Sequence, residues 1–413
     1  MKKVAIIVQR YGIEINGGAE YHAMILAEQL NTVYDIDVLS TCAQDYHTWA
    51  NEYPEGSSVV NGVKVHRFTV NHMRSKSKVH SLLKKLNKRT LLQQGLRRLG
   101  ILEKVERLLS IPDNFKELGD EWSKQQGPFA PGLINYLQEN EYKYDALIFF
   151  TYLYYPTFFG LRIAPHKSIL IPTAHDEPAL TLPVFQEFFQ LPKAILYNTS
   201  AEQRLIHERF NNSRIYNDVV GIGISPSNAD THIDPIKVLK SDAPYFIYIG
   251  RIDPGKGSDV MLSHFIKYQA DVNKEIKLVL IGKSSMQIPQ NKDIIHLGFV
   301  AEDLKLAMLQ DAKALIVPSE HESLSLVTLE SLANGVPVIV NGASEVLVNH
   351  VEQSNAGRIF YDYNSFSEAL TYFLEENNKL GSISELAKAY VITNYSWKAV
   401  LEKFTKAIDY VSR

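Results

Sequence analysis

The sequence predicts an α/β protein made of two doubly wound domains, each built on a mainly parallel sheet. At 413 residues the chain is longer than one hydrophobic core usually supports. Short β-branched runs alternate with helical patterns, as in βαβ units. The periodicity fades over residues 221–242, and a second alternating series then begins. We therefore expect an N-terminal domain over 1–220, a linker, and a C-terminal domain over 221–395.

In the first domain, buried strands alternate with helices, starting from the first residues. The expected elements are strand 4–8, helix 20–30, strands 36–39, 146–150, 168–171 and 194–197, and helix 202–210. The run 4–8 is too short for a signal-peptide core. The most apolar later stretch, 145–161, is interrupted by Thr151, Pro156 and Thr157, so no transmembrane helix is expected.

The second domain repeats this alternation, and its periodicity predicts a doubly wound sheet of its own. The expected strands are 245–249, 277–281, 294–297, 314–317 and 336–340, and the expected helices are 258–270, 302–309 and 325–333.

The composition is that of an ordinary globular protein, with 45% hydrophobic and 22% charged residues. A net charge of −3 argues against a protein that binds nucleic acid along its surface, because such domains are usually basic. The single cysteine, Cys42, excludes an internal disulfide and a cysteine-rich metal site, and it fits a reducing compartment. We expect it to be a core thiol.

A basic stretch breaks the alternation. Residues 74–107 carry eleven Lys or Arg against Glu103 and Glu106, within an insertion that we place at about 74–126. Four apolar residues in it repeat at helical spacing: Val79, Leu82, Leu83 and Leu86. The stretch is interpreted as an amphipathic helical insertion that rests this stripe on the domain. The alternative is a surface that docks on anionic lipid or on a lipid-linked acceptor.

A glycine-rich turn with two cations follows the first strand of the second domain. It runs from Gly250 through Arg251, Gly255 and Lys256 to Gly257, just before a helix. Glycines let the backbone approach an anion, the helix N-terminus offers free N–H groups, and the two cations add full charge. The spacing nearly matches a Walker A loop. It fails where a magnesium-binding hydroxyl is required, because that residue is Gly257.

A second anion-binding candidate lies after strand 314–317, where the chain enters another helix. Ser323 or Ser325 would cap this helix and leave the amides of Leu326 and Val327 free to meet a diphosphate. Two carboxylates flank the helix start. Glu330 suits hydrogen bonds from ribose hydroxyls, and Glu322 would lie near a sugar. The plain alternative for Glu322 is a favourable contact with the helix dipole.

The first domain carries two further candidates. Gly17 and Gly18 end the long loop after the first strand and begin a helix, as a backbone cradle would, although the same pair also serves as a plain turn. His175, Asp176 and Glu177 follow strand 168–171, at the edge where such sheets bind ligands. Three titratable groups at a strand end indicate a functional site.

The order of four motifs resembles that in the retaining, glycogen-synthase-like glycosyltransferases. The motifs are Gly17-Gly18, His175-Asp176, Arg251 with Lys256, and Glu322 with Glu330. These glycosyltransferases have the GT-B fold, two Rossmann-like domains that face a central cleft. The resemblance runs over nearly the whole chain, least over 74–107. It includes the stretch 334–339, then Glu345-Val346, and Tyr395-Ser396-Trp397 at the start of a final helix. The specificity comes from two glutamates separated by seven residues, combined with the arginine and lysine loop.

The resemblance implies a role for each matching residue. Arg251 and Lys256 would hold the donor diphosphate, Glu322 would contact the transferred sugar, and Glu330 would hold the ribose. The implied catalytic set is His175, Glu322, Arg251 and Lys256. The implied donor site adds Gly17, Gly18, Ser325, Leu326, Val327 and Glu330. The base would lie near Lys283, Phe299 and Val300, with Asp176 and Glu177 on the acceptor side. The final helix, 396–413, would pack back on the first domain.

The implied function is transfer of a sugar from a nucleotide sugar, with a UDP-sugar favoured, to a saccharide or lipid-linked acceptor with retention, in polysaccharide or glycoconjugate biosynthesis. The donor is a substrate, and no cofactor, metal or nucleic acid is expected. A cytoplasmic location is expected, with membrane contact through 74–107 as an option. Ser323, Leu324 and Ser325 replace a common Gly-aromatic-Gly run. The alternatives are an epimerase or phosphorylase of the same fold and a non-catalytic regulator that binds nucleotide sugars.

Overall fold

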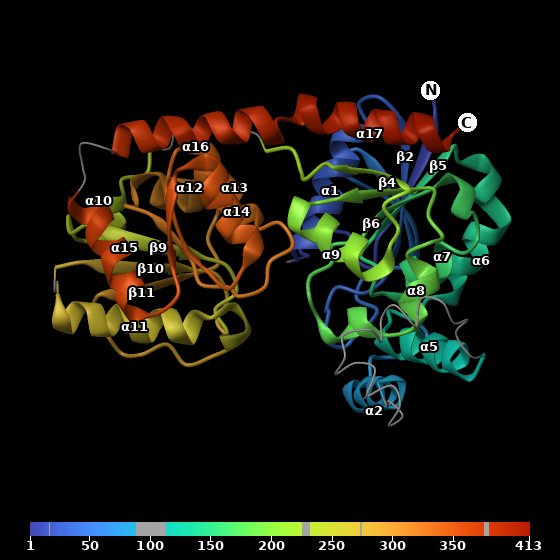
Figure 1. The fold of residues 1–413 in the computed structure, drawn as a ribbon, viewed down its shortest axis with the longest axis horizontal. Helices are drawn as coiled ribbons and strands as arrows, with labels where there is room; N and C mark the ends of the chain where they lie inside the picture. Colours follow the sequence, from blue (N-terminus) through green and yellow to red (C-terminus); the bar gives the residue numbers. More distant parts are fainter. Residues whose placement is uncertain (16, 88–112, 225–231, 273–274, 376–379) are drawn as a thin grey trace. The chain divides into compact units, whose positions relative to one another are not determined.

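The chain folds as two compact units, which we describe from a computed structural model. Unit 1 comprises Met1–Ile222 and Val400–Arg413, and unit 2 comprises Gly223–Ala399. The structure describes all residues except 16, 88–112, 225–231, 273–274 and 376–379 (Figure 1). Most of the basic stretch beyond residue 87 and part of the expected linker therefore lie outside the described residues.

Unit 1 is built on an eight-stranded sheet in the order β3-β4-β2-β1-β5-β6-β7-β8. Its strands are β1 (Lys3–Ile7), β2 (Asp35–Thr41), β3 (Gly56–Val60), β4 (Val63–Phe68), β5 (Ala146–Phe150), β6 (Ser168–Ile171), β7 (Ala194–Tyr197) and β8 (Tyr216–Val219). Its helices are α1 (Gly18–Leu30), α2 (Lys76–Leu86), α5 (Asp113–Gln126), α6 (Pro131–Asn140), α7 (Tyr155–Gly160), α8 (Val184–Phe188) and α9 (Ser200–Phe210). Neighbouring strands are parallel except for the β3–β4 hairpin.

Unit 2 is built on a six-stranded parallel sheet in the order β11-β10-β9-β12-β13-β14. Its strands are β9 (Tyr245–Ile249), β10 (Lys277–Ile281), β11 (Ile294–Gly298), β12 (Leu315–Val317), β13 (Val338–Asn341) and β14 (Gly357–Phe360). Its helices are α10 (Pro235–Leu239), α11 (Ser258–Asp271), α12 (Glu302–Asp311), α13 (Leu326–Ala333), α14 (Glu345–Ser354), α15 (Tyr363–Glu375) and α16 (Leu380–Tyr395). In Figure 1, α11 lies on one side of this sheet, and α12, α13 and α14 lie on the other.

The predicted doubly wound α/β class is confirmed, with a mainly parallel sheet in each unit. The buried core follows from the sequence pattern. Strands β5, β6 and β7 are buried at every position, as expected for a sheet covered on both faces. Cys42 is buried, as expected for a core thiol.

The last helix, α17 (Trp397–Val411), returns the chain to unit 1 from Val400 onward. Its apolar residues Val400, Phe404 and Ile408 are buried. The ring of Tyr410 stacks on Tyr216 of β8, with centroids 4.5 Å apart. Strand β8, which ends the sheet, is thereby covered.

The apolar stripe of α2 packs inward. Leu86 is fully buried, and Val79, Leu82 and Leu83 lie partly buried against the unit 1 core. The stripe is therefore part of the core packing, as the plain interpretation of this helix expected. The exposed side of α2 carries lysines, including Lys76, Lys78, Lys84 and Lys85.

Candidate functional site

The candidate site in unit 2 lies at the carboxyl edge of its sheet. Strands β9 and β12 are neighbours in the middle of the sheet, and the chain continues outward in opposite directions from them. This is the topological switch point at which open α/β sheets bind ligands. The loop beginning at Gly250 follows β9, and the loop beginning at Pro318 follows β12, so both predicted anion-binding loops lie at this point.

The first loop is held by its own polar groups. Asp253 caps a short 3-10 turn, Pro254–Lys256, by accepting a hydrogen bond from the Lys256 amide at 3.2 Å. The same carboxylate accepts a hydrogen bond from Nε of Arg251. The Tyr248 hydroxyl donates to the Arg251 carbonyl at 2.6 Å. The loop therefore presents its two cations from a turn that is fixed within the unit.

Lys256 of the first loop contacts Glu322 of the second. Lys256 Nζ lies 2.7 Å from Glu322 Oε1, and the Glu322 side chain is only 15% exposed. Lys256 was predicted to bind the diphosphate and Glu322 to contact the sugar, which are neighbouring parts of one ligand. The fold thus brings these two residues together.

Gly257 explains why the loop departs from a Walker sequence. Its φ is +70°, and a Cβ there would lie 2.4 Å from the backbone oxygen of Pro318. That oxygen also accepts a hydrogen bond from Asn341 Nδ2 at 2.9 Å. A residue with a side chain would push the two loops apart, so the position requires glycine.

The second loop enters α13 through Ser325, which has a left-handed backbone with φ +61°. Its hydroxyl does not cap a backbone amide, contrary to expectation. It bonds instead to the Thr328 hydroxyl at 2.8 Å. Helix α13 begins at Leu326, so the amides of Leu326 and Val327 lie in its first turn, where N–H groups have no partner within the helix.

Glu330, on α13, faces a lysine that the sequence analysis missed. Lys305 Nζ lies 3.2 Å from Glu330 Oε2 and 2.7 Å from Glu302 Oε1. Burial raises the pKa of Glu330, and the charge of Lys305 opposes this shift. Burial acts to lower the pKa of Lys305, but the two carboxylates outweigh it and raise the pKa.

A buried histidine, also missed, supports the second loop. His350 on α14 is 1% exposed, and its Nε2 lies 2.8 Å from the Leu324 carbonyl oxygen. A carbonyl only accepts, so Nε2 carries the proton, and Nδ1 accepts from the Tyr390 hydroxyl at 2.8 Å. The Tyr395 hydroxyl then donates to Tyr390 at 3.3 Å. Burial lowers the pKa of His350 to about 4, which agrees with a neutral ring.

This chain of hydrogen bonds predicts a graded loss of stability. Tyr390→Phe leaves the buried Nδ1 of His350 without a donor, and we expect the free energy of unfolding to fall by about 1–3 kcal/mol. Tyr395→Phe is the matched control, because it removes only the longer outer bond and should cost less than about 1 kcal/mol. Urea unfolding of both variants measures the difference, and equal losses would contradict the greater weight of the inner bond.

The residues predicted near a base lie at the same carboxyl edge, after β10 and β11. The Lys283 side chain is exposed, Phe299 is 75% exposed, and Val300 is half-buried. The Lys283 carbonyl accepts a hydrogen bond from the Ile252 amide at 2.9 Å, which ties this segment to the first loop. Its neighbour Gly282 has φ +134°, and a Cβ there would lie 1.9 Å from the Gly250 oxygen.

The predicted residues of unit 1 lie at the carboxyl edge of their own sheet. Gly17 is the N-cap of α1, and a Cβ there would lie 2.3 Å from Glu20 Oε2. Glu20 accepts hydrogen bonds from Nε and Nη2 of Arg10 at 2.8 and 2.6 Å, and both side chains are about 7% exposed. Gly18 has open space around it.

The three titratable residues after β6 point to different partners. His175 is half-buried. Asp176 is exposed and lies 3.4 Å from Arg209, and Glu177 accepts a hydrogen bond from the Tyr152 hydroxyl at 2.7 Å. The segment is anchored by Glu202, a residue the sequence analysis missed. Its carboxylate accepts from the amides of Ala174 and Asn198, both at 2.6 Å.

The described residues show neither a metal-binding cluster nor a membrane-spanning helix. They contain no group of three or more His, Cys, Asp or Glu that could hold a metal ion. Within the part of the chain that the structure describes, no helix is both long and apolar enough to span a membrane.

Sequence comparison finds a family match within the C-terminal part of the chain. Residues 230–390 match the family described as Glycosyl transferases group 1. The glycogen synthase of Hydrogenovibrio crunogenus is 28% identical over 182 residues, 40% of this chain and 37% of that protein. The lipopolysaccharide 1,2-N-acetylglucosaminetransferase of Salmonella typhimurium is 28% identical over 192 residues, 40% of this chain and 48% of that protein. The chain spans less than half the length of each of these relatives.

Structure comparison extends over both units. The sucrose-phosphate synthase of Thermosynechococcus elongatus superposes with a TM-score of 0.67 at 14% identity and covers 98% of each chain. Anabaena HepE in complex with UDP superposes with a TM-score of 0.67 at 13% identity, covering 99% of this chain and all of that one. At such identities the likeness concerns the fold, and the predicted GT-B fold is confirmed.

Proposed function

We propose that this chain transfers a sugar from a nucleoside diphosphate sugar. The premise is the match of residues 230–390 to Glycosyl transferases group 1. A UDP-sugar is the favoured donor, and a saccharide or lipid-linked molecule is the acceptor. The anomeric configuration is retained, and the product enters polysaccharide or glycoconjugate biosynthesis. The observation that carries the proposal is the Lys256–Glu322 contact, which joins two anion-binding loops at the switch point of unit 2.

The chemistry of the proposal rests on charge. When the bond between the anomeric carbon and the phosphate breaks, negative charge develops on the diphosphate. Arg251, Lys256 and the first amides of α13 are donors fixed in position before the reaction, so they stabilise this charge without reorganisation. A metal ion is not required by this scheme.

The two glutamates take different roles in the proposal. Glu322 accepts hydrogen bonds from the transferred sugar, next to the phosphate that Lys256 contacts. Glu330 accepts hydrogen bonds from the ribose hydroxyls, and Lys305 favours the ionised carboxylate that this role requires. On the unit 1 side, we assign His175, Asp176 and Glu177 to the sugar hydroxyls or to the acceptor.

Nucleotide titration tests the donor assignment. UDP is expected to bind to the intact chain. Glu330→Gln should weaken UDP binding by about 10- to 100-fold because charge-assisted hydrogen bonds to the ribose are lost. Glu302→Gln is the matched control, because this residue also contacts Lys305 but is 75% exposed. Isothermal titration calorimetry with UDP, GDP and ADP measures the affinities. Unchanged UDP binding by Glu330→Gln would refute the ribose assignment.

The type of reaction is tested by product analysis. Proton NMR of the new linkage should show the anomeric configuration of the donor. Sugar release or rearrangement that needs no saccharide acceptor would instead favour an epimerase or a phosphorylase. Donor binding with neither transfer nor hydrolysis would favour a regulatory protein.

A further inference from the structure

A cluster of arginine and aromatic side chains lies at the carboxyl edge of the unit 1 sheet. Strands β4, β2, β1 and β5 are consecutive neighbours and parallel, so their carboxyl ends lie side by side. The segments that follow them contribute the members of the cluster, which are Arg74, Tyr46 with Trp49, Arg10, and Tyr154, respectively. This is the edge at which such a sheet binds ligands.

Two guanidinium groups face the same pair of rings. The Arg74 guanidinium lies 5.6 Å from the Tyr46 ring centroid and 5.9 Å from that of Trp49. The corresponding distances for Arg10 are 5.7 and 5.9 Å. Tyr154 packs edge-on against Trp49 at 5.4 Å. The rings favour a cation at each position but do not neutralise it.

Within the described residues, one of the two charges has a carboxylate partner and the other has none. Arg10 is paired with Glu20 at 2.6 Å. Arg74 donates to the neutral Gln126 Oε1 at 2.8 Å, and its buried Nε has no hydrogen-bond partner among the residues that the structure describes. Among the described residues, no carboxylate lies within ion-pair distance of Arg74. Leaving a half-buried charge and a buried donor unsatisfied is unfavourable unless a ligand completes them.

The position of Arg74 is fixed. Gln126, which is 4% exposed, binds Arg74 through its side chain and accepts the Trp49 indole N–H on its backbone oxygen at 2.9 Å. The Arg74 amide donates to the Thr48 carbonyl at 2.9 Å. Trp49 has φ +60°, an unfavourable backbone conformation for a bulky residue. Such strain is found preferentially at functional sites.

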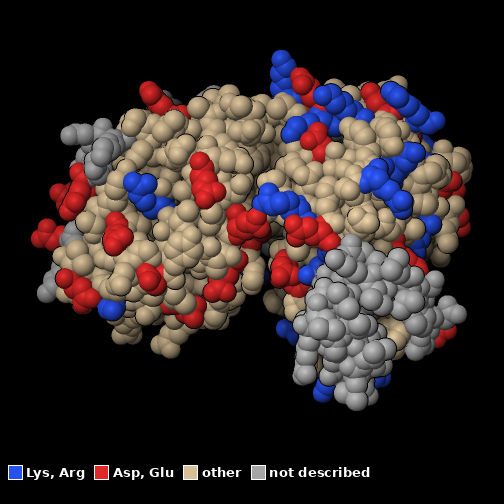
Figure 2. Space-filling model, viewed as in Figure 1, with Lys and Arg blue, Asp and Glu red and all other residues tan. Residues whose placement is uncertain are grey.

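The two units differ in net charge. Unit 1 contains 28 Lys and Arg against 25 Asp and Glu, a net of +3, whereas unit 2 contains 15 against 21, a net of −6. On the face drawn in Figure 2, acidic side chains are prominent on unit 2, and Lys and Arg gather on unit 1. The positive excess of unit 1 comes from residues 88–112, which carry six Lys or Arg against two Glu and lie outside the described residues.

We propose that Arg74 binds an oxyanion, a phosphate or a carboxylate, carried by the saccharide acceptor. The proposal rests on the proposed transferase function and names the chemical class of its acceptor. A planar guanidinium offers paired N–H groups that fit either oxyanion, and the Arg74 guanidinium lies within 6 Å of the Tyr46 and Trp49 ring centroids. A neutral sugar would leave the charge of Arg74 uncompensated.

Calorimetric titration of the intact chain, with UDP present at saturation to occupy unit 2, tests this subsite. The probes are α-D-glucose 1-phosphate, D-glucuronate and methyl α-D-glucopyranoside. We expect at least one anionic probe to bind more tightly than the neutral glycoside, and the arms show whether phosphate or carboxylate is preferred. Arg74→Gln should weaken binding of the preferred anion by about 10- to 100-fold without changing the affinity for UDP. The anion affinity of Arg74→Lys should lie between those of Arg74→Gln and the unaltered chain.

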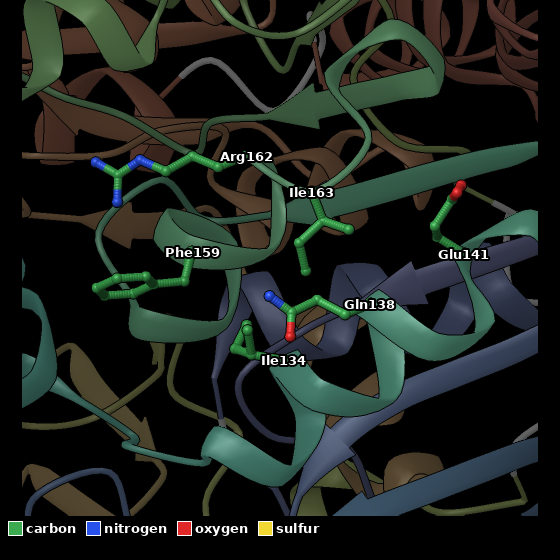
Figure 3. A pocket seen from close by; sticks show the side chains of 6 residues that line it. All are labelled: Ile134, Gln138, Glu141, Phe159, Arg162 and Ile163. Carbon is green, nitrogen blue, oxygen red and sulfur yellow. The ribbon is translucent and has the colours of Figure 1, made fainter.

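Arg162→Gln is the matched control. The Arg162 guanidinium lies 4.0 Å from the Phe158 ring centroid, but it is paired with Asp120 at 3.2 Å. It lines an open pocket of about 430 Å³ with Ile134, Gln138, Glu141, Phe159 and Ile163 (Figure 3). These residues lie where α6 and α7 lead into β5 and β6, at the opposite edge of the sheet. This variant should bind every probe as the unaltered chain does.

Equal binding of the preferred anion by Arg74→Gln and the unaltered chain would overturn the proposal, as would the absence of any preference for anions. Thermal unfolding followed by circular dichroism verifies that each variant is folded. If Arg74→Gln does not fold, Arg74→Lys still tests the proposal. The proposed transferase function fails separately. If UDP does not bind but the anionic probe still responds to Arg74, the donor assignment is wrong and the oxyanion site remains.

Discussion

Lys256→Ala is expected to lower the rate of sugar transfer by about two to three powers of ten. The Lys256 ammonium is fixed at the switch point of unit 2 by its loop and by its 2.7 Å contact with Glu322. In the proposed reaction it meets the charge that develops on the leaving diphosphate, and the loss of one such preorganised donor typically has an effect of this size. The measurement is the rate of UDP release from a UDP-sugar in the presence of acceptor.

Lys277→Ala is the control for this variant. Lys277 also forms an ion pair within unit 2, with Asp293 at 3.0 Å, but it begins β10 at the opposite edge of the sheet. Its removal tests whether the loss of any partly buried ion pair slows transfer. Comparable rates for Lys256→Ala and Lys277→Ala would exclude a role for Lys256 in the chemistry.

Gly257→Ala should disturb both the stability and the activity of unit 2. A Cβ at this position needs a left-handed backbone, which costs about 1–2 kcal/mol, and it also meets the Pro318 oxygen at 2.4 Å. Relieving such a clash typically costs a further 1–3 kcal/mol or so. The two loops would move apart, and a displacement of about 1 Å can lower a rate roughly 100-fold. Urea unfolding and UDP release measure the two effects.

Gly298→Ala separates the clash from the backbone cost. Gly298 has φ +71°, nearly the same as Gly257, but a Cβ there meets nothing within 4 Å. The free energy of unfolding of Gly298→Ala should therefore fall only by the cost of a left-handed backbone at an alanine. If both variants lost the same free energy of unfolding, the contact between Gly257 and Pro318 would have no energetic importance.

The sequence predicted the buried strands better than the exposed ones. Strands β5, β6, β7, β9 and β10 begin and end where the periodicity placed them. The hairpin of β3 and β4 was missed because β3 is exposed at nearly every position, so its residues lack the apolar run that identified the others. Its turn did carry a signal, since Asn61-Gly62 is a preferred pair for a tight hairpin and both residues have positive φ.

The candidate site was predicted through residues that lie within short motifs. Arg251, Lys256 and Glu322 follow strands that the pattern identified, so their arrival at one sheet edge could be expected. The residues that position them could not be found in this way. Lys305 and His350 lie on other helices, and their roles depend on how those helices pack, which local periodicity does not specify. Ser325 was misjudged because its left-handed backbone turns the hydroxyl toward Thr328.

The return of α17 makes unit 2 an insertion within unit 1, between Ile222 and Val400. A protease that cuts between Ile222 and Gly223 therefore does not by itself release unit 2, because unit 2 stays covalently joined to residues 400–413, which pack within unit 1. A fragment that stops at residue 222 would lack Tyr410 and the donor of the Lys403 hydrogen bond to the Val219 carbonyl. Its last strand would then offer an open edge to other chains, so a stand-alone first half needs residues 400–413 fused behind it.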